Sequence, residues 1–165
     1  MDFQLEHAYD ADPNDVLAML TNSEFLRARL AATGALDYQV VECARTTDGG
    51  YRIVTERTVQ ADSPGFAKKV FKPTNSMRQV EDWQADPDAA PTAAWTIEAK
   101  GVPVRTSGTI RLQRVPNGTV QHIAGTIKVS VPLIGGRLER FVFDQARQTI
   151  ETEHRFGEEW LAKQE

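Results

Sequence analysis

Apolar residues recur at helical spacing near the C-terminal end of the chain and predict one long amphipathic helix from Gly135 to Lys163. Four of them fall in one narrow wedge and are expected to be buried: Leu138, Val142, Phe156 and Trp160. Charges alternate in sign on the opposite side, which we expect to face water: Arg147, Glu151, Arg155, Glu159 and Lys163. The rest of the chain is expected to form a sheet that grips this helix.

Polar side chains interrupt the apolar arc at Gln145, Thr149 and Glu153, where a core helix would carry Leu or Ile. Three interpretations stay open: contact with the sheet edge or buried water, orientation of a bound ligand, and acid-base work by Glu153. In a cavity shielded from water, a carboxyl group holds its proton more tightly, as a general acid requires. On that interpretation Glu153→Gln should stabilise the fold near neutral pH.

The preceding chain predicts a strand, two short helices and then about six antiparallel strands. Phe3 to Tyr9 alternates apolar and polar residues, as a half-buried strand does. Asp12-Pro13 opens the first helix with Asp12 as its cap, and the second helix begins at Ser23 and ends by Gly34. Later strands are expected over 38–46, 51–60, 77–84, 95–100, 104–114 and 120–131.

Two segments between these strands differ in character. Pro64 to Lys72 carries apolar residues at helical spacing beside three lysines, which predicts a short helix or lid. Ala85 to Pro91 is expected to be a loop, and Gly135-Gly136 is expected to let the last strand turn sharply into the long helix.

Composition indicates one ordinary globular domain over residues 1–165, with 41% hydrophobic and 25% charged residues. Apolar runs fall short of the roughly 18 residues of a membrane span, and Met1 to Tyr9 lacks signal-peptide features, so we expect a cytoplasmic protein. A net charge of −4 argues against nucleic acid as a partner.

Catalytic and metal-binding motifs are missing from the sequence, so we expect no catalytic residue, metal or cofactor. The three histidines lie on different predicted elements without metal-ligand spacing, and the serines form no Gly-x-Ser-x-Gly elbow. Cys43 fits an inert thiol in a strand. The acidic cluster of Glu81, Asp82, Asp86 and Asp88 lacks EF-hand spacing and predicts a solvated turn.

Several further residues could border a cavity. His7 shares the face of Phe3 and Leu5, and is either a hydrogen-bonded core histidine or a functional one. Trp83 and Trp95 lie on strands, where core packing and cavity lining are both open. The candidate ligand-binding set is Gln145, Thr149, Glu153, His7, Trp95, Trp83 and Phe156. The lysine-rich Pro64–Lys72 segment is too short for stable membrane insertion, but transient contact with an anionic membrane stays open.

The opening strand, the Asp12-Pro13 helix, the Val129–Gly136 passage (VSVPLIGG) and the terminal helix resemble the START-like (SRPBCC) superfamily. More narrowly, the chain resembles an actinobacterial domain family of unknown function. The resemblance implies a helix-grip α+β fold, in which a curved antiparallel sheet of about six to seven strands grips a long C-terminal helix, with two short helices after the first strand.

The resemblance also implies an internal cavity that binds a small hydrophobic molecule of lipid, polyketide or isoprenoid type. Because the superfamily includes carriers, cyclases and chaperone activators, two other classes stay open. A cyclase or dehydratase would need at least two polar groups converging in the cavity, with Glu153 and His7 as the best candidates. A protein-interaction module would have a cavity filled by side chains.

Overall fold

The computed structural model describes residues 1–84 and 86–164. Its elements, in chain order, are β1 (Asp2–Tyr9), α1 (Pro13–Leu20), α2 (Ser23–Ala32), β2 (Asp37–Arg45), β3 (Tyr51–Gln60), the 3-10 turn η1 (Gly65–Ala67), β4 (Thr74–Gln84), β5 (Thr92–Ala99), β6 (Val104–Val115), β7 (Gly118–Val129) and α3 (Gly135–Lys163). This order confirms the helix-grip prediction: seven strands, two short helices after the first strand, and one long helix at the end.

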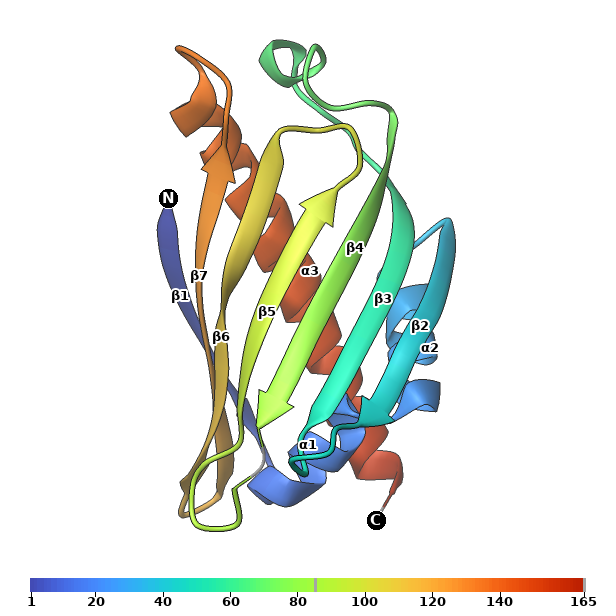
Figure 1. The fold of residues 1–165 in the computed structure, drawn as a ribbon, viewed down its shortest axis with the longest axis vertical. Helices are drawn as coiled ribbons and strands as arrows, with labels where there is room; N and C mark the ends of the chain where they lie inside the picture. Colours follow the sequence, from blue (N-terminus) through green and yellow to red (C-terminus); the bar gives the residue numbers. More distant parts are fainter. Residues whose placement is uncertain (85, 165) are drawn as a thin grey trace.

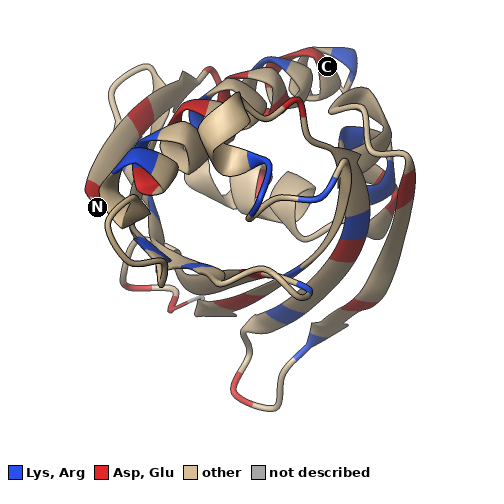
Figure 2. Ribbon diagram, turned by 90° about the horizontal axis from the view of Figure 1, so that it is seen from above, with Lys and Arg blue, Asp and Glu red and all other residues tan. Residues whose placement is uncertain are grey.

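The seven strands form one antiparallel sheet in the order β1-β7-β6-β5-β4-β3-β2, with α3 lying across one face (Figure 1). The sheet curls around that helix when it is seen from above (Figure 2). Gly108 of β6 pairs with Gly125 of β7. A Cβ atom on Gly125 would lie 2.7 Å from the Phe3 ring and 2.8 Å from the Trp95 ring, so this glycine lets both aromatic side chains pack against the sheet.

The long helix packs less tightly than its apolar wedge predicted. Leu138 is fully buried, but Val142, Phe156 and Trp160 are only half-buried. Val142 faces a cavity, and the rings of Phe156 and Trp160 pack against Phe25 of α2. The charged side of the helix is exposed as predicted, at Arg147, Glu151, Arg155, Glu159 and Lys163.

The two short helices close one end of the curved sheet. Phe25, Leu26 and Leu30 of α2 are almost completely buried, as is Val16 of α1. Asp12 caps α1 by accepting a hydrogen bond from the Asn14 amide at 2.9 Å, which confirms the predicted cap. The second helix begins at Ser23 as predicted, and its cap is the residue before, Asn22. The Asn22 side chain accepts a hydrogen bond from the Phe25 amide at 3.0 Å.

The connection into α3 differs from the expectation. The left-handed backbone conformation falls on Leu133, with a φ of 70°, rather than on Gly135 or Gly136. Gly135 serves close packing instead, since a Cβ atom there would lie 3.0 Å from the Val129 carbonyl oxygen. Where a short helix or lid was predicted over Pro64–Lys72, the structure has only the single 3-10 turn η1. The first residue of the predicted loop, Ala85, lies outside the described residues, and residues 86–91 carry no helix or strand.

Candidate functional site in the cavity between sheet and helix

A cavity of about 400 Å³ lies between the concave face of the sheet and α3. Strand alternation builds its walls, because every second side chain of a strand points to the same face. On β4 these are Met77, Gln79, Glu81 and Trp83, all of which line the cavity. The side chain of Gln145 lines the cavity and is also exposed to solvent.

Aromatic and aliphatic side chains make up most of the wall. They come from β1, from the strands β4 to β7 and from α2 and α3, so the cavity is enclosed by residues far apart in sequence. The apolar lining includes Phe3, Phe25, Phe71, Met77, Ile97, Ile110, Ile123, Phe141, Val142 and Ile150. This composition is typical of ligand sites, which combine an apolar lining with a few placed polar groups.

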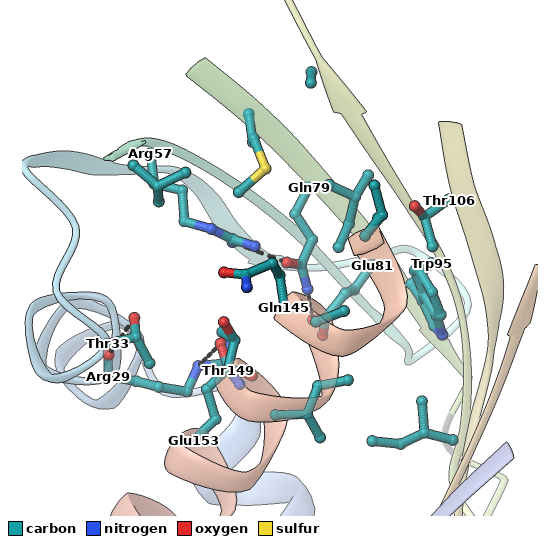
Figure 3. Close-up of a pocket in the computed structure, with 18 of the residues that line it drawn as sticks. Arg29, Thr33, Arg57, Gln79, Glu81, Trp95, Thr106, Gln145, Thr149 and Glu153 are labelled. Atoms are coloured by element: carbon teal, nitrogen blue, oxygen red, sulfur yellow. Dashed lines mark hydrogen bonds and ion pairs between the residues drawn. The ribbon is translucent and has the colours of Figure 1, made fainter. Parts of the chain in front are cut away.

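A connected group of polar side chains lies on one wall (Figure 3). Arg57 of β3 donates to the Gln79 side-chain oxygen at 3.0 Å. The Gln79 amide nitrogen donates to one oxygen of Glu81 at 2.7 Å, and the indole nitrogen of Trp83 donates to the other at 2.9 Å. Glu81 is 4% exposed, and these two neutral donors satisfy both of its oxygens.

A second polar contact joins α2 to α3 across the cavity. The Nε atom of Arg29 lies 3.9 Å from Oε1 of Glu153, which is an ion pair without a hydrogen bond. Burial disfavours the charge of Arg29, but the carboxylates of Glu153 and Glu81 outweigh burial and raise the pKa of this guanidinium. Burial lowers the pKa of Arg57; the negative charge of Glu153 opposes this effect, and the positive charge of Arg29 adds to it. Because a guanidinium stays protonated in proteins, both arginines are cations in a poorly solvated wall.

The opposite part of the wall carries a buried hydrogen-bond donor. Trp95 of β5 is 6% exposed, and its indole nitrogen makes no hydrogen bond among the described residues. Two more buried polar residues, Thr106 and Gln121, line the cavity from β6 and β7. Tyr9 lines it as well, and burial raises the pKa of its phenol far above the ordinary value of 10.0.

The structure places five of the seven candidate ligand-binding residues in the cavity lining. These are Gln145, Thr149 and Glu153 of α3, Trp83 of β4 and Trp95 of β5. Their position is the one that a ligand-binding role requires, and that role stays a prediction.

The other two candidates, His7 and Phe156, lie outside the lining. The His7 ring packs against the His154 ring with centroids 4.7 Å apart, and its buried Nδ1 makes no hydrogen bond to a described residue. Burial, followed by the charge of His154, lowers the pKa of His7. Phe156 stacks on Phe25 of α2 at 5.7 Å, so it holds two helices together.

Sequence reasoning missed the polar residues contributed by the other walls. The prediction of a solvated turn is wrong for Glu81, which lies inside β4 with its side chain buried. Asp82, Asp86 and Asp88 are exposed, as that prediction requires. The sequence does contain a signal for Glu81: Gln79, Glu81 and Trp83 are alternate residues of one strand, so they point to the same face as the aromatic ring of Trp83. Arg29 and Arg57 gave no comparable signal, because charged residues on a short helix and on a polar strand are usually exposed.

Other features restrict the chemistry outside the cavity. The part of the chain that the structure describes contains no group of three or more His, Cys, Asp or Glu side chains that could hold a metal ion. None of its helices is long and apolar enough to cross a membrane. Cys43 is half-buried, its thiol donates to the Thr21 carbonyl at 3.1 Å, and burial raises its pKa, which favours the unreactive thiol form.

A curved antiparallel sheet wrapped around a long C-terminal helix, with a cavity between them, defines a helix-grip α+β protein. Within that class, residues 4–161 match the family described as "protein of unknown function (DUF2505)", and the chain belongs to this family. Similar chains include uncharacterized proteins of Mycobacterium tuberculosis and of Mycobacterium bovis. Each is 28% identical to this chain over 96% of it and 95% of the relative.

Solved structures share the fold at low sequence identity. TTHA0849 from Thermus thermophilus is 18% identical, with a TM-score of 0.63 over 96% of this chain and 95% of that one. Ms6760 from Mycobacterium smegmatis is 10% identical, with a TM-score of 0.62 over 99% of this chain and 92% of that one. Ara h 8.0201 is 15% identical, with a TM-score of 0.58 over 95% and 97% of the two chains. At these identities the likeness concerns the fold alone.

Proposed function

We propose that the protein is a START-like domain that binds a small, largely apolar molecule in the cavity between its sheet and α3. The observation that carries this proposal is the cavity itself: about 400 Å³, lined by aliphatic and aromatic side chains with a few polar groups. This volume falls within the roughly 300 to 1,000 Å³ of small-molecule sites. Lipid, polyketide and isoprenoid ligands all belong to this chemical class.

The free energy of a cavity supports an occupant. At about 24 cal/mol per Å³, a dry cavity of this size would cost on the order of 10 kcal/mol. A typical domain has only about 5 to 15 kcal/mol of total stability. A chain that retains such a space therefore gains by filling it, and an apolar lining favours an apolar occupant over water.

Two competing functions have less support. An interaction module would fill the cavity with side chains, whereas here a cavity of about 400 Å³ remains. An enzyme built on Glu153 and His7 would need both groups in the cavity, and His7 lies outside its lining.

Native mass spectrometry of the purified protein tests the proposal by detecting a co-purified apolar molecule. Ala146→Phe is the test variant, because Ala146 lines the cavity and a phenyl group would fill part of it. Gln148→Phe is the matched control, since it adds the same ring to an exposed position of the same helix. We expect the bound mass in wild type and in Gln148→Phe and its loss in Ala146→Phe. Equal occupancy in all three would place the molecule elsewhere and contradict the proposal.

A further inference from the structure

The polar wall of the cavity presents unpaired hydrogen-bond donors, while its two carboxylates already have partners. Both oxygens of Glu81 accept hydrogen bonds from protein side chains, and the charge of Glu153 is paired with that of Arg29 at 3.9 Å without a hydrogen bond. In contrast, Nε of Arg29 and Nε1 of Trp95 are buried, line the cavity and donate to no described residue. Because an unpaired buried donor is costly, the cavity favours a ligand that carries hydrogen-bond acceptor oxygens over one that carries donors.

Arg57 determines the charge of that molecule. Its guanidinium carries five N–H donors, and the structure's described side chains supply one acceptor for it, the neutral amide oxygen of Gln79. No carboxylate of residues 1–84 and 86–164 lies within ion-pair distance of it, whereas Arg29 has Glu153. A guanidinium in a poorly solvated wall gains most from an anionic partner, and its planar fork matches the two oxygens of a carboxylate.

The position of Arg57 suits the end of an elongated ligand. Arg57 and Gln145 lie together on one side of the cavity, and Trp95 lies across it on the far strand wall (Figure 3). Gln145 is exposed and Trp95 is only 6% exposed, so solvent is nearer to the Arg57 side of the cavity than to the Trp95 side. An amphipathic molecule would thus place its polar end at Arg57 and its apolar body toward Ile97 and Ile110.

We propose that the ligand is a carboxylic acid with an apolar body, whose carboxylate is bound by Arg57 with Arg29 as a second donor. This inference rests on the proposed function and specifies its ligand class. Cationic amphiphiles are disfavoured by the same arrangement, because the carboxylates that could receive an ammonium group already have partners.

The test compares decanoic acid, methyl decanoate and decanol, which share one chain and differ in the head group. Each is titrated into the full-length protein by isothermal titration calorimetry near neutral pH. A charge-assisted hydrogen bond is worth about tenfold to a hundredfold in affinity, so decanoic acid should bind at least about tenfold more tightly than either neutral molecule.

Arg57→Gln removes the positive charge and keeps a polar side chain. It should lower the affinity for decanoic acid by about tenfold to a hundredfold and leave the affinity for decanol within about threefold of wild type. Arg52→Gln is the matched control, because Arg52 lies on the same strand and pairs with Asp82 on the outer face. It should leave all three affinities unchanged.

The outcomes separate the two proposals. Equal binding of the acid and the two neutral molecules by the wild-type protein would overturn the carboxylate assignment and leave cavity binding in place. An acid preference that survives in Arg57→Gln would also overturn it. Failure of all three molecules to bind would contradict cavity binding of simple apolar chains, and with it the inference built upon it.

Discussion

Replacing Glu153 with Gln removes the counter-ion of Arg29 and keeps the shape of the side chain. Arg29 is buried and Glu153 is half-buried, with 10% and 20% of their side chains exposed, and their nearest nitrogen and oxygen are 3.9 Å apart. For unit charges at that distance, an effective dielectric constant of about 20 gives about 4 kcal/mol of gross attraction. No hydrogen bond reinforces the pair, so the net contribution lies below the roughly 3 to 5 kcal/mol typical of breaking a fully buried pair.

We therefore expect Glu153→Gln to lower the free energy of unfolding by about 2 kcal/mol, which for a domain of this size is about 4 to 8 °C in Tm. The sequence alone predicts the opposite sign, because it places Glu153 in an apolar arc without a partner. The difference arises from Arg29, which supplies a positive charge and remains as a buried cation without its ion-pair partner when the carboxylate is removed.

The measurement is urea denaturation followed by far-UV circular dichroism near neutral pH. Glu151→Gln serves as the control, since Glu151 is exposed on the same helix and its substitution should stay within about 0.5 kcal/mol of wild type. A Glu153→Gln protein as stable as wild type, or more stable, would show that the ion pair does not contribute and would refute this reasoning.

Three further predictions concern the packing around the cavity. Because burial raises the pKa of Tyr9, one phenol should stay neutral in an ultraviolet titration with base until the protein unfolds. Tyr9→Phe should remove this late ionisation. If the late ionisation persists in the variant, another tyrosine is the buried one. Because burial and His154 lower the pKa of His7, the unfolded chain binds a proton below about pH 6.5 that the folded one resists, so stability should fall from about pH 7.5 to about pH 5. Denaturation midpoints should show this loss shrinking in His7→Gln, and an unchanged loss would assign it to other groups. Phe25→Ala should lower the free energy of unfolding by about 3 to 5 kcal/mol and Phe156→Ala by less, because Phe25 is fully buried and Phe156 is half-buried. If denaturation shows the reverse order, it contradicts the packing described for α2 and α3.

The fold could be predicted from the sequence because its period-two and helical patterns are local properties. The Asp12-Pro13 cap, the strand from Phe3 and the helix from Gly135 to Lys163 depend on neighbouring residues alone. The depth of burial could not be predicted in the same way. Val142 and Phe156 share a wedge with Leu138, yet one faces a cavity and the other faces α2, since burial depends on what the sheet places opposite each turn.

The cavity residues divide in the same way. Gln145, Thr149 and Glu153 were identifiable because polar residues interrupt an apolar arc on one helix. Arg29 and Arg57 were not, because charged residues on a short helix and on a polar strand are usually exposed, and only the tertiary fold brings these two into the cavity wall. The ion pair between Arg29 and Glu153 joins two helices that are distant in sequence, so neither residue signals the other.

The central claim is that an apolar molecule occupies the space between the sheet and α3, and intermolecular NOEs test it most directly. In a complex of methyl-labelled protein with decanoic acid, we predict NOEs from the alkyl chain to the methyl groups of Ile97, Ile110 and Ile123, which line the cavity. Leu36 and Val41 are exposed apolar residues that do not line it, and they report nonspecific adhesion. NOEs to Leu36 and Val41 without NOEs to the three isoleucines would contradict the claim.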